Sequence, residues 1–331
     1  MNPLVSICCI TYNHEEYIAD AIDSFLMQKT DFPFEIIIHD DASIDNTAAI
    51  IRHYEKNYPE IIRPIYQKEN QYSKGKEIIF ECVFPYVKGE FIAFCEGDDF
   101  WSDANKLQMQ VDFLIKNNTY SACFHSVEII DIHNVPNGRY LGPVGKGNRK
   151  YGMDNNIIGG FIHISSLLMR SRFILNGMPE WAIKSRHGDY ALALFISANG
   201  DVYFLDRVMS KHRTGVKNSV MTKLRENYTK ENEINYHTQR NKTLEDANKY
   251  YNYQYDNQIL KVVYDSKIRI LLLKNRYAEI LDDKYRAYFK DKGIINILKL
   301  VLLTKMPKVS RGLSLIKGKL KIQLGRFKRG H

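Results

Sequence analysis

The chain has 331 residues, of which 44% are hydrophobic and 12% aromatic, and it carries a net charge of +9. A chain of this length and composition can bury a substantial core, which excludes disorder throughout. The charge is uneven: from Lys290 onward 12 Lys and Arg residues accompany one acid, Asp291, so this tail carries +11 and the rest of the chain −2. Because the basic residues belong to a tail, we expect no nucleic-acid-binding core.

The first 116 residues alternate strand-like apolar runs with helical patterns. The predicted strands are residues 4–10, 34–39, 61–67 and 91–95. The predicted helices are residues 15–28, 45–57, 75–87 and 104–116. This alternation is typical of an α/β protein with a mainly parallel sheet flanked by helices.

Helical spacing also predicts which side chains of residues 104–116 point inward. They are Leu107, Val111, Leu114 and Ile115.

Later in the chain the patterns are weaker. Residues 133–152 are rich in Gly, Pro and Asn, which predicts a surface loop or a boundary within one domain. Residues 162–169 and 201–205 have strand character, and residues 190–198 are helical. From about Thr222 the sequence is polar, Tyr-rich and favourable to helix, so we expect a C-terminal helical appendage.

The cysteines and the two ends of the chain suggest a cellular compartment. Five cysteines lie mostly in apolar segments without the spacing of a zinc or redox motif, which predicts buried, reduced thiols. No charged segment with a cleavable apolar stretch opens the sequence. The apolar run at residues 294–303 is too short to span a membrane. We therefore expect a cytoplasmic protein without a transmembrane helix.

Polar side chains follow three of the four predicted N-terminal strands. Residues 11–14 follow the first, Asp40 and Asp41 the second, and residues 96–99 the fourth. In open parallel sheets, ligands bind outside the carboxyl ends of the strands, so we expect one rim to collect these groups. Clustered carboxylates repel one another unless a cation compensates them, and oxygen ligands suit Mg²⁺ or Mn²⁺.

A simpler interpretation remains open from the residues alone. Asp98 or Asp99 could cap the helix that begins near Asp103, and Asp40 or Asp41 could start the turn into the next helix.

Three segments together resemble family 2 glycosyltransferases of the GT-A fold. They read VSICCITYN (residues 5–13), IIIHDDASIDNT (36–47) and GEFIAFCEGDDFW (89–101). The resemblance spans roughly residues 3–215. It implies a GT-A (Rossmann-like) domain that transfers a sugar from a nucleotide donor, usually with inversion at the anomeric carbon.

The resemblance also implies roles for residues at the rim. Thr11, Tyr12 and Asn13 would line the nucleotide pocket, and Asp40 with Asp41 would supply a carboxylate to the base, most simply uracil.

The acid pair has two roles under the same resemblance. Asp98 would approach the ribose or sugar of the donor, and Asp99 would bind the metal at the diphosphate.

The second half resembles later motifs of bacterial polysaccharide-type members: ISSLLMR (164–170), HGDY (187–190) and MSKHR (209–213). In that family Asp189 would be the general base that takes the proton of the acceptor hydroxyl, and the alternative is an N-cap of the following helix. Many members have Glu where this chain has Gly188. His212 would contact the metal or diphosphate, and Arg213 would bind the diphosphate; the alternative for His212 is an ordinary surface or core residue.

The resulting hypothesis is an inverting, metal-dependent transferase in cell-surface polysaccharide synthesis. It would move sugar from a nucleotide-sugar, a UDP-sugar first, to a saccharide or lipid-linked acceptor. We expect residues 1–220 to form the catalytic domain, in which residues 1–130 bind the donor and residues 131–220 bind the acceptor. A competing hypothesis is an inactive sugar-nucleotide-binding or membrane scaffold protein; a nucleotidyltransferase is disfavoured because the first strand lacks a Gly-rich phosphate loop with Lys.

Residues 221–331 would form a helical region that ends in the basic tail. Its apolar and cationic residues are typical of a segment that lies on an anionic membrane, here the inner face of the plasma membrane. Packing of the tail on the catalytic domain is the alternative.

Overall fold

The computed structural model describes residues 2–159, 162–217, 219, 222, 226–282 and 285. The chain divides into two compact units. The described residues of Met1–Tyr228 and Thr243–Tyr255 form the sheet unit, and the described residues of Thr229–Lys242 and Asp256–His331 form the helical unit.

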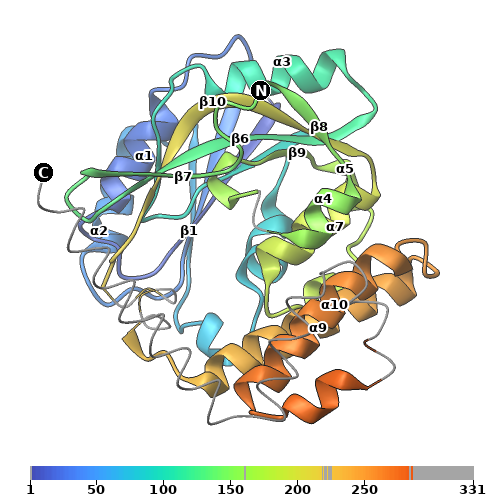
Figure 1. Cartoon of the computed structure of the whole chain (residues 1–331). Helices are drawn as coiled ribbons and strands as arrows, with labels where there is room; N and C mark the ends of the chain where they lie inside the picture. The colour runs from blue at the N-terminus through green and yellow to red at the C-terminus, as the bar shows by residue number, and fades with distance from the viewer. Residues whose placement is uncertain are drawn as a thin grey trace, which may run out of the picture. The chain divides into compact units, whose positions relative to one another are not determined.

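The sheet unit is built on one large sheet (Figure 1). The described strands are β1 (Val5–Thr11), β2 (Phe34–Asp40), β3 (Ile62–Tyr66), β4 (Phe91–Phe94), β5 (Phe100–Trp101), β6 (Tyr120–Ile130), β7 (Pro136–Leu141), β8 (Arg149–Tyr151), β9 (Leu168–Arg170) and β10 (Asp201–Arg213). They lie in the order β3-β2-β1-β4-β9-β6-β10-β5, with β7 beside β6 and β8 beside β10.

Parallel pairs dominate the N-terminal half of the sheet. Strand β1 runs parallel to β2 and to β4, and β2 runs parallel to β3. The carboxyl ends of these strands therefore meet at one rim, as predicted. Strand β9 is antiparallel to β4 and β6, while β6 and β10 are parallel to each other.

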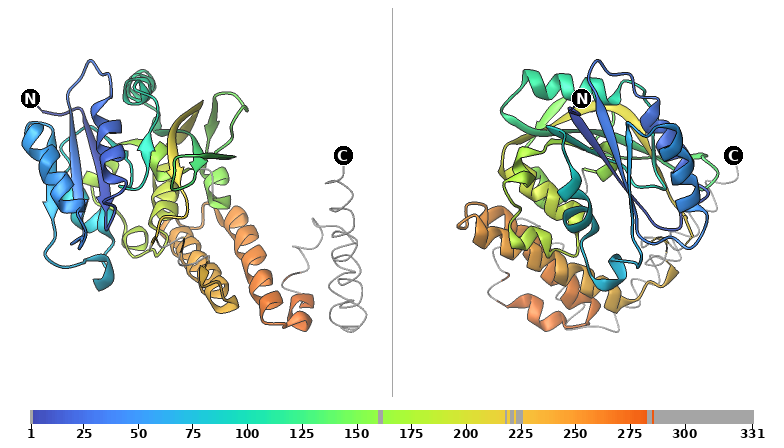
Figure 2. Two further views of the ribbon diagram at one scale, coloured as in Figure 1. Left: turned by 90° about the vertical axis from the view of Figure 1, so that its left-hand side faces the viewer. Right: turned by 180° about the vertical axis from the view of Figure 1, so that it is seen from behind.

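The α-helices of the sheet unit pack on both faces of the sheet (Figure 2). Those that lie wholly in it are α1 (Ile18–Leu26), α2 (Thr47–Asn57), α3 (Lys106–Lys116), α4 (Met153–Ile158), α5 (Arg172–Leu175), α6 (Glu180–Ile183) and α7 (Gly188–Ala198). In the central strands Cys9, Ile36 and Ala93 face one core, which α1, α2 and α3 cover. Cys8 and Ile37 face the other, which α7 covers. The two-residue period of a strand explains why both faces are apolar.

Helix α1 shows why its sequence is helical. Ile18, Ala21, Ile22 and Phe25 recur at three- and four-residue spacing, and none of them is exposed. This apolar stripe stabilises the helix by packing on the sheet rather than by capping, since no side chain caps its N-terminus.

The segment predicted as helix 75–87 has a different structure. It contains a π-helical turn (Ile79–Val83) and a 3₁₀ turn (Phe84–Tyr86), and another 3₁₀ turn (Tyr72–Lys74) precedes it. Pro85 lacks the N–H that a continuing α-helix needs, which favours short turns here. On α3, Ile115 was predicted to face inward and is instead 54% exposed, because it lies next to the buried stripe rather than on it.

Several predicted boundaries in the second half were wrong. Residues 133–152 contain strands β7 and β8 rather than only a loop, and the predicted strand 162–169 is a 3₁₀ turn (Ile164–Ser166) followed by β9. The predicted strand 201–205 continues to residue 213, and β6 was missed. Strands β6 and β10 carry polar residues that pairing in the sheet accommodates, whereas an apolar-run criterion misses them.

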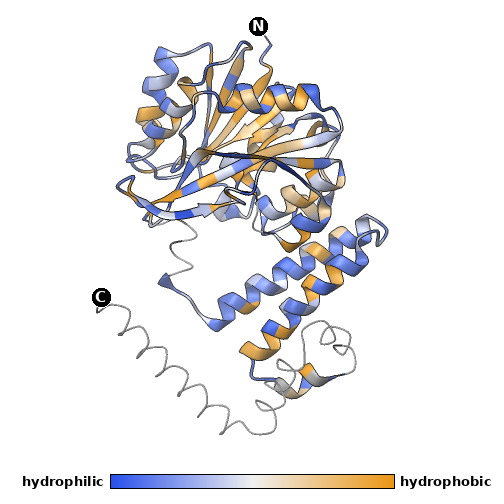
Figure 3. Cartoon of the chain, turned by 45° about the horizontal axis from the view of Figure 1, so that its top comes forward, coloured by the Kyte–Doolittle hydropathy of each residue, from blue (hydrophilic) through white to orange (hydrophobic). Residues whose placement is uncertain are grey.

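The helical unit contains most of α9 (Lys230–Tyr250) and all of α10 (Asp256–Leu273), followed by a 3₁₀ turn (Tyr277–Leu281). Arg269 on α10 donates from Nε to Glu233 on α9 at 2.6 Å. Polar residues cover much of both helices (Figure 3). Within the described residues no helix has the length and apolar content that a membrane crossing requires. The basic tail lies outside the described residues.

Candidate active site

Asp99 is the most constrained acid at the rim. Its side chain is fully buried after β4, and its carboxylate accepts the backbone N–H of Arg213 at 2.8 Å. The Nδ1 atom of His212 lies 3.1 Å from both carboxylate oxygens. Helix α3 begins at Lys106 with Asn105 as the N-cap residue, so neither Asp98 nor Asp99 caps it. The capping interpretation of this acid pair is therefore wrong.

A second imidazole joins Asp99 and His212. The Nε2 atom of His163 is 4.0 Å from Asp99 Oδ2, and the rings of His163 and His212 have centroids 4.5 Å apart. One ligand atom from each of the three residues lies within 4.8 Å of the others. Burial lowers the pKa of His163 to about 3, so the imidazole is neutral at pH 7. A carboxylate and two imidazoles form a donor set that fits a divalent cation.

Sequence reasoning missed His163. It immediately precedes the family motif of residues 164–170, which begins with the 3₁₀ turn Ile164–Ser166, and no metal-binding spacing marks it. Only the pairing of β9 with β4 and β6 brings this segment near the carboxyl end of β4.

Four carboxylates influence one another around this rim. Burial, with the charges of Asp98, Asp189 and Asp99, raises the pKa of Glu96 well above its usual range. Burial also raises the pKa of Asp99, although the hydrogen bond and charge of His212 oppose the shift. Such a cluster requires positive charge or donors to stay ionised, which is the physical reason to expect a cation here.

Asp189 lies in the first turn of α7, where the N-cap residue is His187. It is therefore not the N-cap, and that alternative is wrong. Its side chain reaches solvent. Desolvation by the surrounding protein nevertheless raises the pKa of Asp189, while the charge of His212 lowers it. A carboxylate with a raised pKa is a stronger base than an ordinary one.

Gly188, which precedes Asp189, lies beside Glu77. A Cβ atom placed on Gly188 would lie 3.4 Å from Glu77 Oε2. Burial, with the charges of Glu81 and Asp189, raises the pKa of Glu77. Glu77 therefore lies beside position 188, where many family members have a glutamate.

The loop after β1 is held by side chains of the loop after β2. The N–H of Asn13 donates to Ser43 Oγ at 2.9 Å, and Asn13 Oδ1 accepts from the N–H of Ile44 at 2.9 Å. Asn13 has a φ of 56°, a left-handed conformation that asparagine tolerates. The ring of Tyr12 is 41% exposed and so remains accessible to a ligand.

Thr11 and His14 connect this loop to the acid pair. Thr11 Oγ1 and His14 Nδ1 are 3.1 Å apart, and His14 Nε2 is 3.9 Å from Asp98 Oδ2. The residues predicted to line a donor pocket, residues 11–13 and Asp98, are therefore neighbours at one rim.

Asp40 and Asp41 have separate structural partners. Asp40 Oδ1 accepts from the N–H of Ser43 at 3.3 Å and from its hydroxyl, which is the turn-forming role that the simpler interpretation gave it. Asp41 accepts the N–H groups of Gln71 and Tyr72 at 2.7 and 3.0 Å. Both carboxylates are buried, and neither caps α2, whose N-cap is Asn46.

Arg213 occupies a different place from the one predicted. Its guanidinium donates to the backbone carbonyl of Asp98, to Asp20 Oδ2 at 2.8 Å and to Asn134 Oδ1 at 2.7 Å. With 2% exposure, this side chain holds the acid loop from inside the protein and cannot reach a diphosphate without leaving its partners. The prediction that Arg213 binds the diphosphate conflicts with this geometry.

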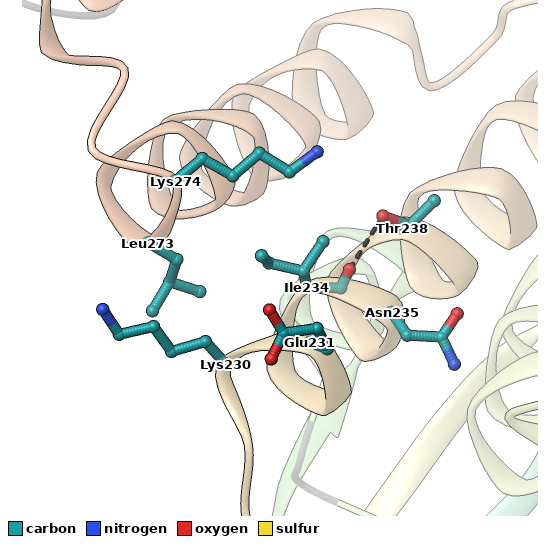
Figure 4. Close-up of a pocket in the computed structure, with 7 residues that line it drawn as sticks. All are labelled: Lys230, Glu231, Ile234, Asn235, Thr238, Leu273 and Lys274. Carbon is teal, nitrogen blue, oxygen red and sulfur yellow. Dashed lines mark hydrogen bonds between the residues drawn. The ribbon is translucent and has the colours of Figure 1, made fainter.

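A pocket of about 410 Å³ in the helical unit carries no comparable chemistry (Figure 4). Its lining residues come from the start of α9 and the end of α10: Lys230, Glu231, Ile234, Asn235, Thr238, Leu273 and Lys274. This lining contains one carboxylate and no histidine. The chemistry-bearing groups named above therefore belong to the sheet unit.

Comparison with known proteins identifies the class. The family model "Glycosyl transferase family 2" matches residues 6–177, more than half of the chain. The chain belongs to glycosyl transferase family 2.

Two relatives illustrate the range of similarity. An uncharacterized protein of Mycobacterium tuberculosis is 33% identical over 227 residues, which are 66% of this chain and 62% of the relative. The chain therefore matches less than two thirds of that relative's length. The Escherichia coli UDP-Glc:alpha-D-GlcNAc-diphosphoundecaprenol beta-1,3-glucosyltransferase WfgD is 34% identical over 140 residues, 42% of this chain and 51% of that protein.

Solved structures share the fold at low sequence identity. TarS of S. aureus, residues 1–349 in complex with UDP, is 16% identical with a TM-score of 0.57, over 85% of this chain and 76% of that one. The mannosyltransferase PcManGT of Pyrobaculum calidifontis, in complex with GDP-Man and Mn²⁺, is 14% identical with a TM-score of 0.51, over 93% and 88%. The predicted GT-A fold with a C-terminal helical region is confirmed.

Proposed function

We propose that the protein is an inverting, metal-dependent glycosyltransferase of cell-surface polysaccharide synthesis. The donor is a nucleotide-sugar, a UDP-sugar first, and the acceptor is a saccharide or lipid-linked saccharide. The observation that carries the proposal is that Asp99 and His212 meet at the rim of the sheet, 3.1 Å apart, and that Asp189 lies close enough to His212 for the charge of the imidazole to lower the pKa of the Asp189 carboxylate. Such an arrangement provides a cation site and a base within one active site.

The relatives support the choice of substrates. TarS has been solved with UDP and with UDP-GlcNAc, and the name of WfgD gives UDP-Glc as donor and a diphosphoundecaprenol-linked sugar as acceptor. In this chain Thr11, Tyr12 and Asn13 would bind the nucleotide. Asp40 is the better candidate for the base, because both oxygens of Asp41 already accept backbone N–H groups.

Asp99 and His212 would hold a Mg²⁺ or Mn²⁺ ion at the diphosphate. When bound, such an ion acts as a Lewis acid that stabilises the negative charge of the departing diphosphate. Asp98 lies beside His14 at the edge of the same loop and would bind the ribose or sugar. Arg213 would position the loop through the carbonyl of Asp98 and its own backbone N–H to Asp99.

Asp189 would activate the acceptor. The acceptor oxygen attacks the anomeric carbon, the bond from that carbon to the diphosphate breaks, and the proton of the acceptor hydroxyl passes to Asp189. A neutral hydroxyl is a poor nucleophile, and a positioned base accelerates such steps by about 10²- to 10⁴-fold. A single displacement of this kind inverts the configuration at the sugar.

The test is a screen of nucleotide-sugars for release of the nucleoside diphosphate, with Mn²⁺ or Mg²⁺ and with saccharide and lipid-linked acceptors. We expect release with one donor and its loss in Asp99→Asn. Full metal-dependent transfer by Asp99→Asn would refute the metal assignment. If nucleotide-sugars bind but no nucleoside diphosphate is released with any acceptor, the inactive binding protein is favoured instead.

A further inference from the structure

His163 extends the proposed site beyond the two ligands that the sequence suggested. We infer that His163, Asp99 and His212 together form the protein's ligand set for one divalent transition-metal ion. The protein binds this ion before any nucleotide, and its affinity is higher for Mn²⁺ than for Mg²⁺. The inference rests on the proposed function, because the same ion would then serve the diphosphate of the donor.

The spacing of the donor atoms fits one ion. Ligands about 2.1 Å from an octahedral ion lie about 3 Å apart when adjacent and about 4.2 Å apart when opposite. His212 Nδ1 is 3.1 Å from the oxygens of Asp99, and His163 Nε2 is 4.0 Å from Asp99 Oδ2. All three ligand atoms lie within 4.8 Å of one another, so shifts of a fraction of an ångström bring them around an ion.

The ring of His163 is oriented by a hydrogen-bonding partner on Nδ1, the nitrogen that does not face Asp99. Its Nδ1 lies 2.8 Å from Ser165 Oγ, which in turn lies 3.1 Å from Ser210 Oγ. The backbone N–H of Ser165 also points to this Nδ1, at 3.3 Å. Metal binding through Nε2 therefore selects the tautomer in which Nδ1 carries the proton and donates it to Ser165 Oγ, at the expense of this longer hydrogen bond. Both serines are fully buried, so this support is fixed by packing. Metal-binding histidines are oriented in this way by a partner on the second ring nitrogen.

Asp99 is similarly fixed. It is fully buried and receives the backbone N–H of Arg213 at 2.8 Å. Two ligands that the protein already orients, His163 and Asp99, lower the ordering cost of metal binding before the nucleotide arrives. A metal held by one carboxylate alone would instead depend on phosphate oxygens to complete its shell.

The chemistry of the ligands favours Mn²⁺. Mg²⁺ prefers oxygen ligands and retains water, whereas imidazole nitrogen suits first-row transition ions. Two imidazoles with one carboxylate therefore discriminate against Mg²⁺ although both ions accept the carboxylate.

Titration of nucleotide-free protein with Mn²⁺, followed by the electron paramagnetic resonance signal of the free ion, tests the inference directly. We expect one Mn²⁺ per chain, an affinity for Mn²⁺ at least about tenfold higher than for Mg²⁺, and a loss of at least about tenfold in Mn²⁺ affinity for His163→Ala. The matched control is His53→Ala, which removes an exposed imidazole on α2. Unchanged Mn²⁺ affinity in His163→Ala, or equal affinity of the wild type for both ions, would overturn the inference.

Pulsed paramagnetic resonance of the Mn²⁺-loaded wild type needs no variant and so does not depend on whether His163→Ala folds. Couplings to nitrogen atoms of two imidazoles support the inference, and coupling to one or none contradicts it. The outcome is independent of transfer activity. If the protein transfers sugar but does not bind Mn²⁺ in the absence of nucleotide, this inference is wrong and the proposed function stands. If the protein binds Mn²⁺ through two imidazoles but transfers no sugar, the inference stands and the proposed function is wrong.

Discussion

At the residue scale, Asp189 is the side chain whose replacement best separates chemistry from binding. We expect Asp189→Asn to lower transfer by about 10²- to 10⁴-fold, since the amide cannot accept the proton, while donor affinity is retained. Calorimetry with UDP and a transfer assay measure the two quantities. An equal loss of binding and transfer would indicate a structural role.

The same residue predicts the direction of a pH profile. Asp189 must be deprotonated to act as a base, and desolvation raises its pKa above the ordinary value of aspartate despite the opposing charge of His212. We therefore expect kcat/KM to fall as pH drops through that raised pKa.

Lys106 predicts a pH dependence of stability. It is fully buried on α3, with Nζ 2.8 Å from Gln110 Oε1 and 4.0 Å from the ring centroid of Trp101, and burial lowers its pKa to about 7. In the unfolded chain a lysine titrates near about 10.4. Above pH 7 the unfolded state therefore binds more protons, so stability rises with pH, by at most about 1.4 kcal/mol per unit.

Chemical denaturation between pH 7 and 8 measures this slope as the difference between the wild type and Lys106→Met. The difference is needed because the five buried cysteines begin to lose protons in the unfolded state over this range and add the same opposing slope to both proteins. Lys106→Met keeps the aliphatic length and should flatten the slope, whereas Lys116→Met, an exposed change on the same helix, should leave it intact. A slope that persists in Lys106→Met would show that other groups cause it.

At the element scale, the turn after β4 must pass close to the turn after β1. A Cβ on Gly97 would lie 2.6 Å from Thr11 Oγ1, 2.7 Å from Thr11 Cβ and 3.1 Å from His14 Nδ1. Gly97→Ala should therefore displace Thr11 and His14, cost about 1–3 kcal/mol of stability and weaken UDP binding.

Thermal unfolding and calorimetry with UDP measure both effects. Gly152→Ala is the matched control, because a Cβ there would meet only Asp201 Oδ1 at 3.8 Å. If both variants bind UDP as the wild type does, the close approach at Gly97 does not contribute to the donor site.

The strands differed in how well the sequence predicted them. The runs that became β1, β2 and β4 are apolar on both faces because helices cover both faces of the sheet, so composition alone identifies them. Strand β6 contains the buried pair His125 and Ser126, and no apolar run identifies it before its neighbours are known.

At the scale of the whole molecule, the basic tail is a separate prediction. Each Lys or Arg near an anionic surface contributes about 1 kcal/mol, so removal of residues 290–331 should abolish sedimentation with anionic vesicles. Zwitterionic vesicles are the control and should not sediment the intact chain. Unchanged sedimentation of the truncated chain with anionic vesicles would refute a membrane role for the tail.

The sequence by itself determined the fold class and much of the rim. Strand ends are local features, and β1, β2 and β4 are parallel neighbours, so Thr11, Asp40 and Asp99 could be assigned to one edge before the structure was known. The family resemblance rested on the same segments, and the match over residues 6–177 agrees with it.

Only the tertiary structure decided that His163 meets Asp99. The family resemblance had already implied that His212 and Asp99 contact the same metal, but His163 lies 64 residues further along the chain than Asp99, and strand pairing rather than sequence spacing brings it to the buried carboxylate. It also placed Arg213 under the acid loop rather than at a diphosphate, since the two terminal nitrogens of its buried guanidinium donate to three oxygen atoms of the protein.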